Sequence, residues 1–330
     1  MCDKVTSELA GVAYDAAVDG EARRTRTLTE IWSRFPALEE RVRRVYGLRV
    51  PRHLAVFAAL WHSADDAERE GLNQLGVAPF GLTEYLAPDG LSLVGAGGLD
   101  ERLHGRYRCD PAEFVTVLGG DSDGLHYGLW YDDPAQLPAF VVFNWARDSA
   151  ETWTNGAATL LVQLRHRIDA VAADYGADGP EARALRPLAA ALDWFAAADR
   201  EAVAADGLPS WAQSPRQSTA VSLFPVLPTD SGDPRLESSG QRLRALQAGG
   251  PDAASLIAEA ERQLAAGQPA YALAVGSELH WIDADEYRDR GLALLVGAYQ
   301  ALGRDALADI AEVHAAHRDL RSVSVLTRTH

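Results

Sequence analysis

The spacing of hydrophobic residues predicts helices near the start of the chain. Thr27-Leu28-Thr29-Glu30 has the S/T-x-x-E pattern of a capping box, so a helix is expected to begin there. A second helix is expected from Pro36 to Gly47 and a third after Pro51, each with apolar residues three or four positions apart. Residues 1–26 are small and polar with a weak pattern, and are expected to form a weakly ordered lead-in.

Three strand-like runs follow, at residues 114–118, 125–131 and 140–144. The connections between them are too short to hold a crossover helix, so neighbouring strands must be antiparallel. The sequence therefore predicts an α+β fold with an antiparallel β-meander and flanking helices, over residues 27–176. Residues 74–104 are expected to be irregular or to form short strands.

The rest of the chain is predicted to be a mainly helical domain over residues 177–330, with Asp174–Pro180 as the candidate boundary. Helical spacing covers residues 157–173 before this boundary. After it, helical spacing covers residues 181–205, 253–266, 270–282, 285–302 and 304–318. Residues 206–252 hold six prolines and several Gly and Ser. They are expected to form a long loop, and loops of this length are usually functional or disordered.

Charge narrows the classes of partner. Lys plus Arg is 31 and Asp plus Glu is 47, a net charge of −16 that repels phosphate backbones and anionic lipid. Another protein is therefore the expected partner, with no nucleic acid and no membrane. Only two cysteines, no secretory signal pattern and no run of about 20 apolar residues lead us to expect a cytoplasmic protein. A single lysine among many arginines and alanines favours a bacterial source.

One glycine-rich turn could carry chemistry. Residues 120–124 match G-x-S-x-G, in which Ser122 would be a nucleophile on a strand-to-helix elbow. The residues that follow alternate like a strand, so turn formation explains the motif better. Asp121 and Asp123 could hold a divalent ion. A hydrolase or metal-dependent enzyme using Asp121, Ser122 and Asp123 is thus one alternative.

Other motifs are weaker still. His314 and His317 could meet on one helical face, where two imidazoles can bind a metal, but an exposed helix face is the better interpretation. The sequence has no Walker motif and no complete dinucleotide fingerprint. We therefore expect no catalytic residue, no cofactor and no metal ligand.

The strand region resembles a known family. Cys109–Asp121 and the following stretch from Tyr127 to Asn144 resemble the histone PARylation factor family, which has a D-P-P-E-F strand, a Gly-Asp turn and an acidic-Pro turn before a third strand. Asn155-Gly156 also matches its N-G before a helix. The resemblance implies a two-domain α+β protein that binds an ADP-ribosyltransferase and completes its active site with a glutamate.

The sequence departs from that family at the glutamate. The corresponding stretch, Leu264–Tyr271, holds no carboxylate, so the general base is missing. The family's partner-facing arginine follows a D-x-G-x-R loop, which Asp230–Arg235 resembles with one insertion. The resemblance thus implies a non-enzymatic accessory factor that binds or regulates an ADP-ribosyltransferase, with Asp233, Arg235 and Gln268 as candidate partner contacts.

Residues 46–145 also resemble the SUKH superfamily of bacterial immunity proteins, in which a strand, a Gly-Asp-rich turn and a second strand recur. An acidic immunity protein that neutralises a basic toxin would use the −16 charge to speed association. This function is a second alternative.

Overall fold

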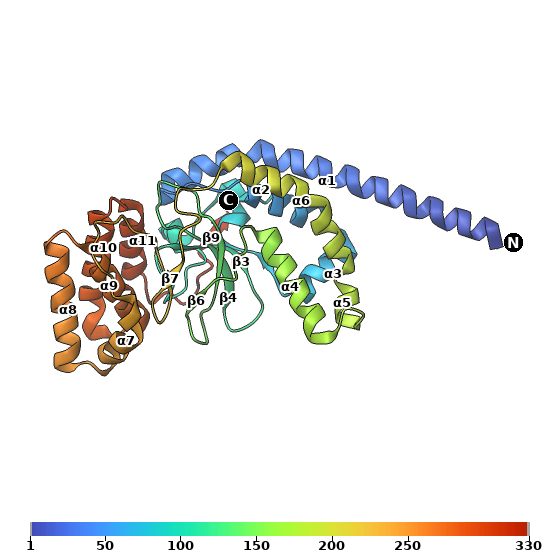
Figure 1. Cartoon of the computed structure of the whole chain (residues 1–330). Helices are drawn as coiled ribbons and strands as arrows, with labels where there is room; N and C mark the ends of the chain where they lie inside the picture. Colours follow the sequence, from blue (N-terminus) through green and yellow to red (C-terminus); the bar gives the residue numbers. More distant parts are fainter. Residues whose placement is uncertain (1, 329–330) are drawn as a thin grey trace.

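A single long helix opens the chain. The computed structural model describes residues 2–328, with side chains described from Asp19 onward. Helix α1 (Cys2–Tyr46) lies over the body, and its N-terminal part extends beyond it (Figure 1). The expected helix start at residues 27–30 is wrong, because α1 runs through them and through Pro36. The Thr27 hydroxyl donates to the Arg23 carbonyl at 3.0 Å instead of capping a terminus.

Packing explains why α1 continues through the predicted helix start. Four of its residues, from Ile31 to Val42, are at most 1% exposed and belong to the main core. They form one apolar face that lies against α2 (His53–Ser63), the helix predicted after Pro51. The burial of that face outweighs the local capping preference.

More helices pack behind α2. They are α3 (Asp66–Gln74), α4 (Leu160–Tyr175), α5 (Pro180–Ala184) and α6 (Arg186–Asp206). Helix α6 packs against α2, α3 and α4, so residues 186–206 lie with the N-terminal half, past the boundary expected near residue 176. The division of the chain into two domains stays a prediction.

The central sheet has five antiparallel strands in the order β1-β3-β4-β5-β6. They are β1 (Ala78–Pro79), β3 (Phe114–Gly119), β4 (Leu125–Trp130), β5 (Val141–Trp145) and β6 (Thr152–Trp153). The meander and the α+β class are confirmed. A register shift between Thr116 and Leu118 bends β3 against β4.

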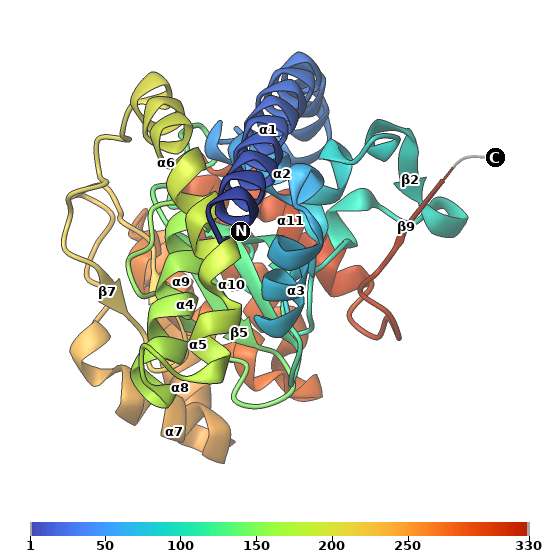
Figure 2. The same ribbon diagram turned by 90° about the vertical axis from the view of Figure 1, so that its right-hand side faces the viewer.

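Short elements fill the segment between β1 and β3, as predicted. They are η1 (Gly81–Leu86), η2 (Gly90–Ser92), β2 (Leu93–Gly95), η3 (Ala96–Gly98) and η4 (Glu101–Leu103). Strand β2 pairs with β9 (Leu326–Arg328), which brings the end of the chain back to the N-terminal half (Figure 2).

The C-terminal helices form a separate group at the end of the molecule away from the free end of α1 (Figure 1). Four of them occupy the predicted segments: α8 (Gly250–Ala265), α9 (Pro269–Ile282), α10 (Arg288–Ala301, after η6, Asp285–Tyr287) and α11 (Asp305–Ala316). The 206–252 segment is shorter as a loop than predicted, because η5 (Leu236–Ser238) and α7 (Ser239–Ala248) occupy its end, and β7 (Gln217–Ser218) pairs with β8 (Leu223–Phe224). Among the described residues, none of the helices combines the length and apolar character that crossing a membrane requires.

Candidate functional site

The three candidate partner contacts lie close together at the start of α9. The backbone of Gly232 faces Gln268, and a Cβ placed on this glycine would lie 3.0 Å from the Gln268 Cβ. The amide of Ala270 donates to the carbonyl of Ser231 at 2.9 Å. The fold therefore brings the loop before α7 against the connector between α8 and α9, although 30 or more residues separate them in sequence.

Arg235 has an unusual backbone conformation. Its φ and ψ are 52° and 50°, in the left-handed region, which costs a residue with a side chain about 1–2 kcal/mol. The Asp233 carboxylate accepts a hydrogen bond from the Arg235 amide at 2.8 Å and steadies the turn. The guanidinium lies 4.6 Å from the ring centre of Tyr271 and donates to Glu259 at 3.2 Å. With 42% of its side chain exposed, Arg235 is presented to solvent.

A buried ion pair supports this loop from below. Arg242 and Glu278 are 2% and 0% exposed at their side chains and form two N–H···O bonds of 2.7 Å. The other edge of the Arg242 guanidinium donates to the carbonyls of Pro234 and Arg235, at 3.2 and 3.0 Å. One arginine thus connects a buried carboxylate on α9 to the backbone that presents Arg235.

A cavity of about 370 Å³ opens beside this loop. Arg235, Arg242 and Tyr271 line it from one side, and Ser255 and Leu256 of α8 from the other. An exposed guanidinium beside an aromatic ring recognises carboxylate or carbonyl oxygens through its planar set of donors. The arrangement can therefore hold a polypeptide segment that offers such oxygens.

Glu259, the carboxylate that the Arg235 guanidinium contacts, is a poor proton acceptor. Glu259 accepts hydrogen bonds from Gln263, Arg262 and Arg235. These bonds, that from Gln263 first, hold the pKa of the Glu259 carboxyl below its usual value. A base with a lowered pKa takes protons less readily, and residues 264–271 supply no other carboxylate. Glu259 is therefore suited to contact and not to proton transfer.

The turn between β3 and β4 does not form a nucleophile elbow. Ser122 is exposed, and its carbonyl accepts from the Leu125 amide at 2.6 Å as strand β4 begins. The strand–turn–helix geometry that would activate the serine is therefore not formed. Over the described part of the chain, three or more His, Cys, Asp or Glu side chains nowhere gather as a metal would require.

The expectation of an exposed helix face at His314 is wrong. His314 is buried, and its ring lies 5.4 Å from that of His280. Burial lowers the pKa values of both imidazoles, that of His280 to about 3. The two rings are packed as neutral groups between α9 and α11, because the apolar spacing of α11 continues through His314.

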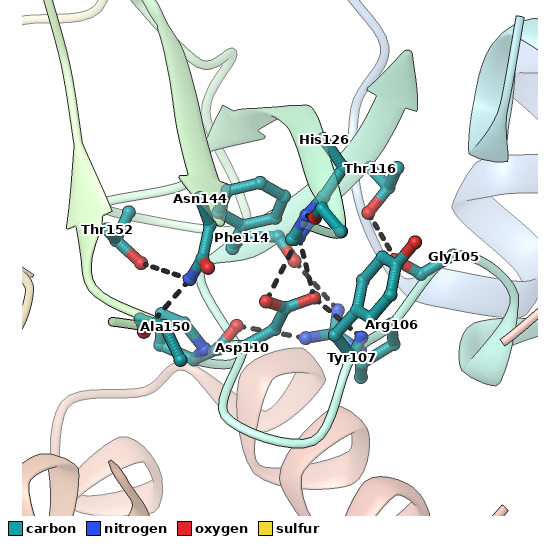
Figure 3. A network of polar contacts seen from close by, with 12 residues as sticks. Gly105, Arg106, Tyr107, Asp110, Phe114, Thr116, His126, Asn144, Ala150 and Thr152 are labelled. Atoms are coloured by element: carbon teal, nitrogen blue, oxygen red, sulfur yellow. Dashed lines mark hydrogen bonds and ion pairs between the residues drawn. The ribbon is translucent and has the colours of Figure 1, made fainter. Parts of the chain in front are cut away.

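A second buried polar network joins the sheet to the C-terminal helices (Figure 3). His126 Nε2 lies 3.1 Å from both carboxylate oxygens of Asp110, and its Nδ1 lies 2.8 Å from the Gly124 carbonyl. Beside them, Arg106 donates to the carbonyls of Pro111 and Phe114, both at 2.9 Å.

The far end of α9 is anchored on this network. His280 Nε2 lies 3.0 Å from the Asp110 carbonyl, and the Trp281 indole donates to the Ala150 carbonyl at 3.1 Å. Asn144 donates to the same carbonyl at 3.1 Å (Figure 3). Sequence reasoning missed this network, and its one signal was a histidine among apolar strand residues.

Comparisons with known proteins give sequence matches to part of the chain. Residues 38–199 match the family model described as Histone PARylation factor 1. The mouse (Mus musculus) Histone PARylation factor 1 is 29% identical over 125 residues, covering 36% of this chain and 35% of the relative. The zebrafish (Danio rerio) protein of that name is 31% identical over 116 residues, covering 33% and 32%.

The chain thus spans about a third of the length of the curated relatives it matches. Asp233, Arg235 and Gln268 lie outside the family-model match, so their role as contacts stays a prediction. The likeness to the SUKH superfamily gains no support from these matches. The predicted resemblance to the histone PARylation factor family is confirmed over residues 38–199, where the chain matches the family model.

Proposed function

We propose that the protein is a non-enzymatic accessory factor that binds an ADP-ribosyltransferase through the Arg235 loop and regulates it without supplying a glutamate. The observation that carries the proposal is the Arg235 loop itself. A solvent-exposed arginine is held in a left-handed conformation by a buried ion pair, in a chain with a Histone PARylation factor 1 region.

The geometry of the loop supports a binding role. Strained backbone persists only where the surrounding structure holds it, and such positions cluster at functional sites. Here Arg242 holds the carbonyls of Pro234 and Arg235 before any partner arrives. A contact that is rigid in advance loses little side-chain and loop entropy on association, which favours affinity.

The chemistry around the loop supports regulation over catalysis. Residues 264–271, where the resemblance places the family's glutamate, hold no carboxylate, and Glu259 is engaged by three donors. The partner should therefore gain a contact surface and no proton acceptor. A protein partner also agrees with the net charge of −16, which disfavours nucleic acid.

Copurification with tagged protein from the source cells tests this proposal. We expect a transferase to elute with the wild-type chain and to fall at least about tenfold in an Arg235→Ala variant, as for an interface hot spot. Arg200→Ala on α6 is the matched control, because Arg200 is exposed and lies outside the site. Its eluate should equal that of the wild type.

Three outcomes would contradict the proposal. They are the absence of any transferase from the wild-type eluate, equal recovery with Arg235→Ala, and the recovery of a toxin in place of a transferase. The last result would favour an immunity protein.

A further inference from the structure

A second cavity, of about 450 Å³, lies between the sheet and α4. This volume falls within the usual range of about 300–1,000 Å³ for small-molecule sites. Strands β4 and β5 form its floor, α4 forms its wall, and the β3–β4 turn lies at its rim. No role proposed above uses it.

Three aromatic rings form the floor. Tyr127 and Phe143 are paired across β4 and β5, and Trp145 lies two residues further along β5, so all three point to one face of the sheet. The ring centres of Tyr127 and Phe143 are 6.3 Å apart, and those of Phe143 and Trp145 are 5.2 Å apart. Phe143 and Trp145 are partly exposed and their planes are 86° apart, so a flat ligand ring can stack on Trp145 while its edge meets Phe143.

The wall holds a buried glutamine side chain, that of Gln163 on α4. Gln163 on α4 is 3% exposed and lines the cavity, and in the described part of the chain its Oε1 atom has no hydrogen-bond partner. An unsatisfied buried polar group costs about 1–3 kcal/mol, so a ligand that pairs with it gains correspondingly. A glutamine amide presents a donor beside an acceptor, which matches the amino edge of adenine.

The charges around the cavity favour a neutral flat ligand over a charged one. Arg167 lines the cavity, but it donates to the Tyr127 hydroxyl and to the Leu75 carbonyl, the latter at 2.9 Å. Its formal charge is opposite to that of Asp121 at the rim, so the two cancel and the cavity does not select a cation. The net charge of −16 disfavours a polyphosphate. A neutral ring with an amino group and a neighbouring ring nitrogen fits these conditions best.

We infer that this cavity binds a neutral purine nucleoside of the adenosine type. The base stacks on Trp145 and meets the perpendicular Phe143 ring with its edge, its amino edge pairs with Gln163, and its ribose hydroxyls lie toward the Asp121 carboxylate. The Asp121 turn then belongs to a binding site and not to a hydrolase. The inference does not depend on the Arg235 loop.

Calorimetric titration of the full chain with adenosine tests the inference. We expect saturable binding by about 1 mM, the weak end of the affinity scale. Gln163→Met keeps the side-chain length and removes both polar atoms, so affinity should fall about tenfold, as for the loss of a paired base edge. Gln300→Met, at an exposed position of α10, is the matched control and should bind as the wild type.

N6,N6-dimethyladenosine, which lacks the amino protons, should bind about tenfold more weakly than adenosine to the wild type and equally weakly to Gln163→Met. If Gln163→Met fails to fold, Trp145→Leu decides the matter, because a lost stacking platform should also weaken binding about tenfold. The inference is overturned if adenosine does not bind or if these variants bind it like the wild type. It is also overturned if ethylguanidinium, a flat cation, displaces adenosine at lower concentration than adenosine itself requires, because the cavity would then select a cation.

Discussion

Two turns of similar composition differ in what supports them. The β3–β4 turn, Asp121-Ser122-Asp123-Gly124, and the loop Asp230-Ser231-Gly232-Asp233-Pro234-Arg235 are both rich in Asp, Ser and Gly. Each holds one residue with a side chain at positive φ, Asp123 at 47° and Arg235 at 52°. Asp tolerates this conformation through its short polar side chain, whereas Arg does so poorly.

The support accordingly differs. Backbone bonds close the first turn, such as that from the Gly120 amide to the Leu125 carbonyl at 2.7 Å. The second has a buried arginine beneath it that is paired with Glu278. The comparison teaches that turn composition alone does not identify a site, and that the side chains below a turn decide what it can present.

Removing the support should have the largest effect. Arg242→Met leaves Glu278 buried without its partner, and breaking a buried pair in this way costs about 3–5 kcal/mol. We expect the free energy of unfolding in urea to fall by that amount and capture of the transferase to be lost.

A double variant separates the two effects. In Arg242→Met/Glu278→Leu no uncompensated charge remains, so most of the stability should return while the loop carbonyls still lack their donor. Full recovery of partner capture in this double variant would show that the ion pair does not position Arg235.

A buried carboxylate on α6 offers a comparison with Glu278. Asp199 on α6 accepts from the Thr159 hydroxyl at 2.6 Å, and burial raises its pKa to about 6. Because the folded state binds the proton more tightly than the unfolded state, this group reduces stability as pH rises from about 4 to about 6, by up to about 3 kcal/mol.

Asp199→Asn should therefore raise the free energy of unfolding by about 2–3 kcal/mol at neutral pH and by little near pH 4. Urea melts at several pH values measure this. A variant that is equally stabilised at both pH values would show that the carboxyl is not the cause.

Replacing Arg235 should change the free energy of unfolding little and should weaken partner binding strongly. Arg235→Gly relieves the left-handed backbone but adds unfolded-state entropy, so unfolding should change by less than about 1 kcal/mol. Capture of the transferase should fall as in Arg235→Ala. Asp123→Gly makes the same backbone change at the other turn and should leave capture intact; reduced capture there would remove the distinction between the turns.

The smallest effect is expected at Ser122. Ser122→Ala changes an exposed turn residue and should alter stability by no more than about 0.5 kcal/mol. Any slow hydrolysis of p-nitrophenyl acetate by the protein should be the same before and after the change. A loss of hydrolysis in the variant would restore the serine-nucleophile hypothesis.

The sequence predicted the meander well, because short connections leave antiparallel pairing as the one geometry the chain can adopt. The sequence also predicted α8 to α11, because the apolar residues of these helices are regularly spaced. The predicted helix start at residues 27–30 was wrong because the capping pattern at Thr27 is local, whereas the apolar face that continues through Phe35 is buried by distant residues. Helix α7 was missed because a ten-residue helix that contains Gly240 and ends before Gly249 gives little periodicity.

The candidate site was predicted only in part. A motif resemblance suggested Arg235, and the structure brings Asp233 and Gln268 beside it. Arg242 and Glu278 could not be found in this way, because they lie 36 residues apart and each looks like an ordinary charged residue on a helix. The same holds for Gln163, because the unpaired state of its Oε1 atom among the described residues depends on its surroundings and not on its residue type.

Helix α9 has a mechanical consequence. Its 14 residues span about 21 Å at 1.5 Å per residue, with the Arg235 loop at one end and the Asp110 and Ala150 carbonyls at the other. A helix of this length behaves as a stiff rod, so a partner that tilts it at Gln268 also displaces His280 and Trp281. Force applied at the surface would then reach the edge of the sheet without any loop having to carry it.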